Sequence, residues 1–219
     1  MKTKQGAALL LAGTAILLTA CGEAPEKITD AQAARDAMDN AATIYLTGDL
    51  DAIHQQTDIL ADGRVAGRME ESGFLDPKWT VTAGGETWFY MKIVTDQPIN
   101  ENTDDYVSAS TFGFYDENDN CLGYAQKRAE RGDDGRGYYY YFMDAEENLK
   151  DYCMEEYGKY FMDMDGNVLA EDDSAMDFGG NTCHVEIDMA EDSDARIDFM
   201  DKLVMYYERF DELKFWNDD

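Results

Sequence analysis

The chain has 219 residues, of which 47 are acidic and 18 are basic, so its formal net charge is −29 at pH 7. This charge makes nucleic acids and anionic lipid surfaces poor partners, because both are repelled. It favours cations or cationic peptides, with an affinity that falls as salt rises, although solubility is the simpler explanation for so many acids. Apolar residues make up 44% of the chain and aromatic residues 12%, which is enough for one substantial core.

The start of the chain has the pattern of an export signal. Lys2 and Lys4 precede a mainly apolar run over residues 7–20, and Cys21 follows that run. The run is shorter than the roughly 20 apolar residues that span a bilayer. We therefore expect a cleaved signal over residues 1–20 rather than a permanent membrane helix.

The flank of this run, Leu18-Thr19-Ala20-Cys21, resembles the lipobox of bacterial lipoproteins at all of its four positions. The resemblance implies that Cys21 receives a diacylglyceryl group and that cleavage makes it the new N-terminus. It also implies an extracytoplasmic protein held on the bacterial cell membrane, since two acyl chains anchor a protein far better than one. An ordinary secretory signal that happens to precede a cysteine is the alternative, but no A-x-A-like cleavage site is evident.

The residues after the signal divide into a tether and one domain. Residues 21–28 would be the lipidated cysteine and a short polar tether, with the sequence GEAPEK at 22–27. An extended chain spans about 3.5 Å per residue, so this tether would keep the domain within roughly 25 Å of the lipid surface. Residues 29–219 are expected to form a single domain.

The domain begins with a helical pattern. Thr29 is placed to cap it, Asp30 lies in the first turn, and apolar residues recur at helical spacing as far as Tyr45. The pattern predicts a helix over about 30–46, closed by Gly48. The secondary structure of residues 49–76 stays open between a second short helix and the start of a sheet.

The middle of the chain reads as β-structure. Gly84-Gly85 lies between two runs rich in aromatic and β-branched residues, which predicts a hairpin. Further strand-like segments follow, separated by acidic or glycine-containing turns, and short strands at this spacing favour an antiparallel meander. These segments cover about 108–115, 121–128, 137–143, 149–154, 158–162, 167–170 and 182–188.

The C-terminal segment returns to helical periodicity. Ser193 can cap a helix, Asp194 lies in its first turn, and seven apolar side chains form one stripe. They are Ile197, Met200, Leu203, Val204, Tyr207, Phe210 and Leu213. We expect this amphipathic helix to lie across the sheet, with its aromatic residues and methionines in the core.

A short motif, F-[MY]-D-x-x-x-N, occurs three times, at 114–120, 142–148 and 161–167. It predicts three similar hairpin turns, in which the Phe enters the core and the Asp side chain accepts backbone N–H groups. Asn or Gly then takes the positive φ, and a following Leu returns to the core. The third copy, with Asp163, Asp165 and Asn167, looks at first like a calcium loop. However, the Gly at position six and the Glu at position twelve of such a loop are missing, so we expect turns and no dedicated metal site.

The aromatic hairpins over residues 138–173 also faintly resemble the repeats of choline- or glucan-binding cell-wall modules. Those repeats begin with Gly-Trp and have a regular period, and both features are absent here. If the resemblance held, Tyr138 to Tyr141 would be the stacking residues, with alternate rings on opposite faces of the strand.

No catalytic motif stands out. The only histidines are His54 and His184, and adjacent Cys183 and His184 would point to opposite faces of a strand. The pairing of Cys121, Cys153 and Cys183 stays open between one disulfide with one thiol left over and three unpaired thiols. We therefore expect that the protein is not an enzyme and that it binds no cofactor.

These observations predict an α+β fold, with an N-terminal helix, an antiparallel β-meander of several hairpins, and a C-terminal amphipathic helix packed on the sheet. The expected role is that of a membrane-anchored, non-enzymatic binding or scaffold lipoprotein, and a cationic or cell-wall partner stays open. Two alternatives stay open. One is a lipid or acyl-chain carrier with a cavity between sheet and helix, and the other is a cell-wall glycan-binding module.

Overall fold

The computed structural model describes residues 24–49, 54–73, 75–94, 111–132, 135–155, 157–177, 182–190 and 196–217. The two helices are α1 (Ala31–Asn40) and α2 (Phe199–Asn217). The first strands are β1 (Thr43–Asp49), β2 (Gln56–Ala61), β3 (Arg64–Ser72), β4 (Lys78–Ala83), β5 (Glu86–Val94), β6 (Thr111–Tyr115) and β7 (Cys121–Gly132). The remaining strands are β8 (Gly135–Asp144), β9 (Leu149–Glu155), β10 (Tyr160–Asp163), β11 (Val168–Asp172), β12 (Ala175–Asp177) and β13 (Thr182–Met189).

The strands form one closed antiparallel barrel. Each strand from β1 to β10 pairs with the next in the sequence, β11 pairs with β13, and β13 returns to pair with β1. Twelve of the thirteen strands make this ring, and β12 pairs only with β13. The prediction of an α+β fold, with an antiparallel meander and a C-terminal helix packed on the sheet, is therefore wrong. The sheet closes on itself because β1 pairs with β13 along seven residue pairs, from Thr43 with Asp188 to Asp49 with Thr182.

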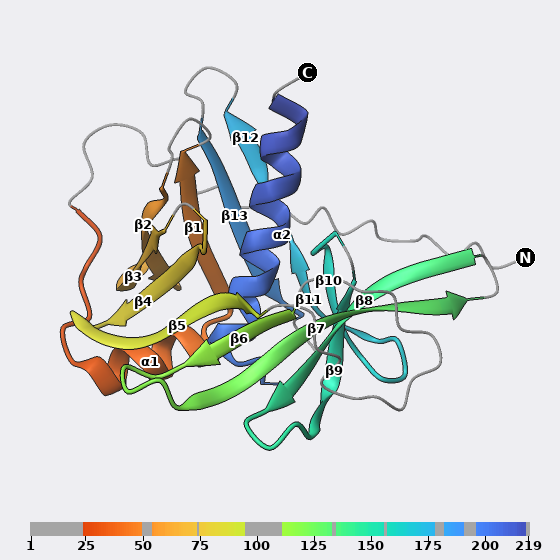
Figure 1. Cartoon of the computed structure of the whole chain (residues 1–219). Helices are drawn as coiled ribbons and strands as arrows, with labels where there is room; N and C mark the ends of the chain where they lie inside the picture. The colour runs from red at the N-terminus through yellow and green to blue at the C-terminus, as the bar shows by residue number, and fades with distance from the viewer. Residues whose placement is uncertain are drawn as a thin grey trace, which may run out of the picture.

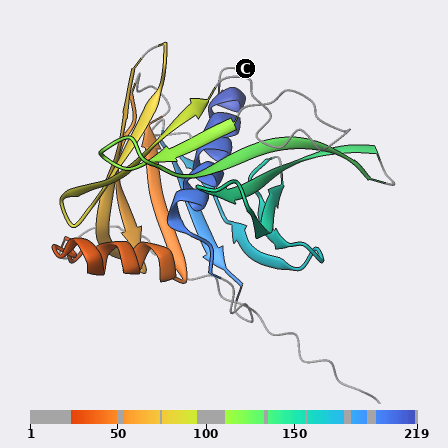
Figure 2. The same cartoon turned by 60° about the horizontal axis from the view of Figure 1, so that its bottom comes forward.

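The N-terminal helix is shorter than predicted. Asp30, rather than Thr29, caps α1, because its side chain accepts a hydrogen bond from the N–H of Ala33 at 2.8 Å. The helix ends at Asn40, and the residues that were expected to continue it form β1 instead. Ile44, Leu46 and Gly48 are buried in alternation with more exposed neighbours, which is the period of a strand. Figure 2 shows α1 lying across the ends of the first strands.

The open segment 49–76 belongs to the sheet where it is described, as β2 and β3. The hairpin at Gly84-Gly85 is present between β4 and β5, and both glycines have positive φ. The later strand-like segments correspond to β6–β11 and β13.

The C-terminal helix α2 is present, but it does not lie on one face of a sheet. It runs through the middle of the barrel, with β1 and β13 to one side and β7–β9 to the other (Figure 1). Its residues 201–206 are all buried, so the helix is enclosed around its whole circumference there. Phe199 contacts the rings of Trp88 and Phe89. Further along, Tyr207 contacts those of Trp79 and Phe112. The C-terminal helix therefore fills the interior of the barrel and packs against the inward side chains of the strands. Ser193, the predicted cap, lies outside the described residues.

Candidate functional site

The buried half of α2 carries two charged side chains. Asp201 and Lys202 are each only 1% exposed. A buried charge costs several kcal/mol unless it is paired and hydrogen-bonded. The sequence analysis does not single out either residue. An acid and a base inside an otherwise apolar helical segment nevertheless indicate that each needs a buried partner.

Asp201 finds its partners on β9. Its Oδ2 accepts hydrogen bonds from Lys150 Nζ and from the Tyr152 hydroxyl, both at 2.6 Å, and Lys150 also bonds Asp198 at 2.8 Å. The other carboxylate oxygen, Oδ1, has no hydrogen-bond partner within the described structure. Complete burial raises the pKa of Asp201 to about 6, because desolvation outweighs the attraction of Lys150. The pKa of Lys150 is raised, since its two carboxylate partners outweigh its own desolvation.

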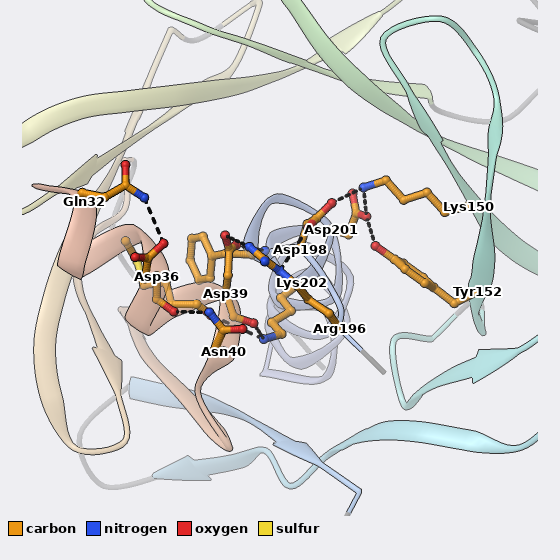
Figure 3. A network of polar contacts seen from close by, with 12 residues as sticks. Gln32, Asp36, Asp39, Asn40, Lys150, Tyr152, Arg196, Asp198, Asp201 and Lys202 are labelled. Carbon is orange, nitrogen blue, oxygen red and sulfur yellow. Dashed lines mark hydrogen bonds and ion pairs between the residues drawn. The ribbon is translucent and has the colours of Figure 1, made fainter. Parts of the chain in front are cut away.

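Lys202 and Asp39 join the two helices end to end. Lys202 Nζ lies 3.4 Å from the carbonyl oxygen of Met38 and 3.2 Å from that of Asp39, so it caps the last turn of α1. In return, the Asp39 carboxylate accepts a hydrogen bond from the N–H of Phe199, the first residue of α2, at 2.9 Å. Arg196 adds an ion pair to Asp39 at 2.7 Å (Figure 3). Burial lowers the pKa of Lys202 to about 8.

Further along α2, more pairs tie it to the barrel wall. Glu208 accepts a hydrogen bond from the Tyr140 hydroxyl at 2.5 Å and lies 3.5 Å from Lys127. Arg209 Nε lies 2.6 Å from the Asp172 carboxylate. Together with the pairs of Asp201 and Lys202, these contacts reach β7, β8, β9, β11 and α1. The polar groups of α2 thus fix its position inside the barrel, and they engage groups of the same chain.

The three repeated motifs form turns of one geometry. In each, one oxygen of the Asp carboxylate accepts the backbone N–H groups two and four residues further on, and the other accepts the Asn side-chain amide. In the third copy these bonds to Asp163 are 2.9, 2.8 and 2.7 Å long. The predicted role of the Asp is confirmed. The positive φ falls on Gly166 in the third copy, as predicted, but in the first two copies it falls on Asp119 and Glu147, one residue before the Asn.

The calcium-like cluster of the third copy therefore forms a hydrogen-bonded turn. Both oxygens of Asp163 are engaged by Asn167, and these hydrogen bonds lower the pKa of the carboxyl. Within the described residues, no group of three or more His, Cys, Asp or Glu side chains is arranged to hold a metal ion.

The apolar positions of the motif follow the prediction in part. Phe114, Phe142 and Phe161 are fully buried, as expected. Of the following leucines, Leu169 is buried, but Leu149 points outward and is 47% exposed. The return to the core predicted for Leu149 is wrong, because Lys150 takes the inward position to reach Asp201.

The tyrosines proposed for stacking do not form a common exposed row. Tyr140 is fully buried against α2, and Tyr138, Tyr139 and Tyr141 are half-buried.

The histidine and cysteine residues lie apart from the polar network. His184 stacks on Tyr45 at 5.2 Å, whereas neighbouring Cys183 is buried. Burial raises the pKa of the Cys183 thiol to about 11, so it is not a thiolate at neutral pH. Cys121, Cys153 and Cys183 form no disulfide. Cys21, the predicted lipidation site, lies outside the described residues, as does the rest of the signal.

Comparison with known proteins gives no relative: no protein-family model, no curated protein and no solved structure matches the chain significantly. In the part of the chain that the structure describes, no helix is long and apolar enough to cross a membrane.

Proposed function

We propose that the protein is a membrane-anchored extracytoplasmic lipoprotein, and that its folded part is a non-enzymatic binding or scaffold domain. The lipobox-like residues Leu18-Thr19-Ala20-Cys21 support the anchor. The interior of the barrel supports the second part of the proposal.

The start of the fold fits a domain close to a membrane. The N–H of Val65 donates to the carbonyl of Glu26, and the N–H of Ile28 donates to the carbonyl of Val65, both at 2.9 Å. The chain is thus attached to β3 from Glu26 on. Only residues 22–25 separate this attachment from Cys21, which is a reach of roughly 15 Å. A lipid on Cys21 would hold the barrel nearly against the membrane.

The observation that carries the binding role is that α2 fills the barrel. Aromatic side chains of Phe199 and Tyr207 pack against rings of β4, β5 and β6, and the charged groups of the helix pair with the wall. An acyl chain would have to displace these contacts, so we do not propose the carrier role. Because the interior of the domain is occupied by its own chain, a partner would bind to the outer surface.

Metabolic labelling with a fatty-acid analogue tests the anchor. The wild-type protein should be labelled, and the Cys21→Ala variant should lose the label. Cys121→Ala is the matched control, since it removes another thiol of the same chain, and it should keep the label. Labelling that persists in Cys21→Ala would overturn the proposal.

A further inference from the structure

Two lysines face each other on the outer wall of the barrel. Lys78 of β4 pairs directly with Lys92 of β5, and the two strands lie side by side in the sheet (Figure 1). Trp79 and Met91, their neighbours in the chain, belong to the core, so both lysines point outward, where they are half-buried. Side chains opposed in this way begin about 5 Å apart, and like charges placed there are destabilising. The pair therefore needs groups that offset its charge.

Two tyrosine rings hold the ammonium groups. Lys78 Nζ lies 3.5 Å from the ring centre of Tyr90, and Lys92 Nζ lies 5.9 Å from the same centre and 4.6 Å from that of Tyr115. The two rings stack at 5.3 Å, and the Tyr90 hydroxyl donates a hydrogen bond to Asp119 at 2.5 Å. The rings are thus fixed, and they draw both ammonium groups to one place. A ring face attracts a cation but carries no net charge, so it does not neutralise the pair.

Neither ammonium group forms an ion pair with a carboxylate in the part of the chain that the structure describes. A carboxylate partner would be easy to supply, since 47 residues of the chain are acidic. Other basic side chains do have one, as Lys150 has Asp201 and Arg209 has Asp172. Nor do the two lysines protect a free strand edge, because β4 and β5 are paired on both sides. The pair is therefore available to an anion from outside the chain.

We propose that Lys78 and Lys92 together bind the phosphate group of a small soluble ligand. A phosphate monoester carries a charge of about −1.5 to −2 at pH 7, which matches two ammonium groups better than the single charge of a carboxylate does. Its several oxygens accept charge-assisted hydrogen bonds from both lysines at once. The net charge of −29 repels a polyanion far more than a single phosphate group, so a small ligand is favoured.

The lysine pair lies away from the proposed membrane anchor. The residues after Cys21 join β3 at Val65, whereas Lys78 pairs with Ser72 at the other end of β3. A strand rises about 3.3 Å per residue, so these two points of β3 are roughly 23 Å apart. The phosphate of a lipid headgroup is therefore a poorer ligand for the pair than that of a soluble molecule. This inference rests on the proposed binding role and specifies the ligand.

Titration of the full-length protein with inorganic phosphate, in zwitterionic nanodiscs, tests the site. With lysine labelled by 13C at its ε-carbon, NMR follows each ammonium group, and Lys→Gln variants assign the signals. Sodium phosphate replaces sodium chloride at constant ionic strength, so that screening stays the same. We expect the signals of Lys78 and Lys92 to shift together and to saturate, with a Kd on the order of 1 mM. Acetate should bind at least about fivefold more weakly, because it carries less charge and fewer oxygens.

Charge-matched variants locate the site. Lys78→Gln should weaken the phosphate response of Lys92 at least about tenfold, and Lys92→Gln should do the same to Lys78, because each variant removes one of the two donors. Either variant suffices should the other fail to fold. Lys159→Gln makes the same charge change at an exposed position before β10, and it should change the Kd by no more than about twofold.

Equal losses in Lys78→Gln and Lys159→Gln would show attraction to overall charge and overturn the proposal. So would the absence of a saturable shift of the Lys78 and Lys92 signals at about 20 mM phosphate. Binding to phosphatidylglycerol vesicles that Lys78→Gln abolishes would also overturn it, because the ligand would then be a lipid headgroup. Loss of the phosphate response together with intact labelling of Cys21 would remove the phosphate site and leave the anchor in place.

Discussion

Replacing Asp201 by Asn should change the pH dependence of folding stability. The pKa of Asp201 is about 6 in the folded protein and 3.8 in its reference state. The protonated carboxyl therefore stabilises the fold at pH values below 3.8, and this contribution is lost as the pH rises through about 6. One pKa unit corresponds to about 1.4 kcal/mol, so the loss amounts to about 3 kcal/mol. Asn is neutral throughout and shows no such loss.

The free energy of unfolding, measured by urea titration from about pH 3.5 to pH 7, tests this. The difference between Asp201→Asn and wild type should shift in favour of the variant by about 3 kcal/mol as the pH rises. Asp165→Asn, which removes an exposed carboxylate, is the control and should show a much smaller change. A flat difference, or one that shifts toward the wild type, would show that Lys150 compensates for the burial of Asp201. Our account of the site would then be wrong.

Three further outcomes follow from the fold. Asp163→Ala should lower the melting temperature more than Asp165→Ala in thermal denaturation, because only Asp163 binds the turn through its side chain oxygens; equal effects would contradict the shared turn geometry. Phe199→Ala should destabilise the protein by about 3–5 kcal/mol in urea titration, since it removes a buried ring that packs on Trp88 and Phe89, whereas Leu75→Ala should cost little. A small effect of Phe199→Ala would place α2 outside the barrel. Millimolar calcium should leave the melting temperature almost unchanged, because Asn167 and backbone N–H groups already engage Asp163, and a large rise would indicate a metal site.

The repeated turns could be predicted from the sequence because their structure is local. One Asp and one Asn four residues apart supply all the side-chain bonds, and the buried Phe before each Asp fixes the incoming strand. The prediction of positive φ at Asn or Gly holds for Gly166 but is wrong by one position in the first two copies, where Asp119 and Glu147 take it.

β1 could not be assigned correctly from local pattern. Its residues continue the helical spacing of α1, yet the alternation of Ile44, Leu46 and Gly48 fits a strand equally well. Pairing with β13, more than a hundred residues away in the chain, decides between the two, and a local pattern carries no information about that partner.

The prediction that the C-terminal helix lies across one face of the sheet is wrong for a related reason, because it too depends on strands distant in the chain. A single apolar stripe predicts one covered face, but the closed barrel covers residues 201–206 of the helix on every side. The enclosed polar side chains then need partners on distant strands. Oδ2 of Asp201 is bound by Lys150 and Tyr152, which lie in a segment that the sequence shows only as a strand of alternating character. The candidate site therefore became visible only with the fold.

The mass of the N-terminal peptide of the protein purified from its own membrane tests the central claim most directly. Trypsin cuts after Lys27, so the account predicts a peptide that begins at Cys21, ends at Lys27 and carries the mass of a diacylglyceryl group on the cysteine. An unmodified Cys21 in the membrane-derived protein, or an N-terminus at any other residue, would contradict it.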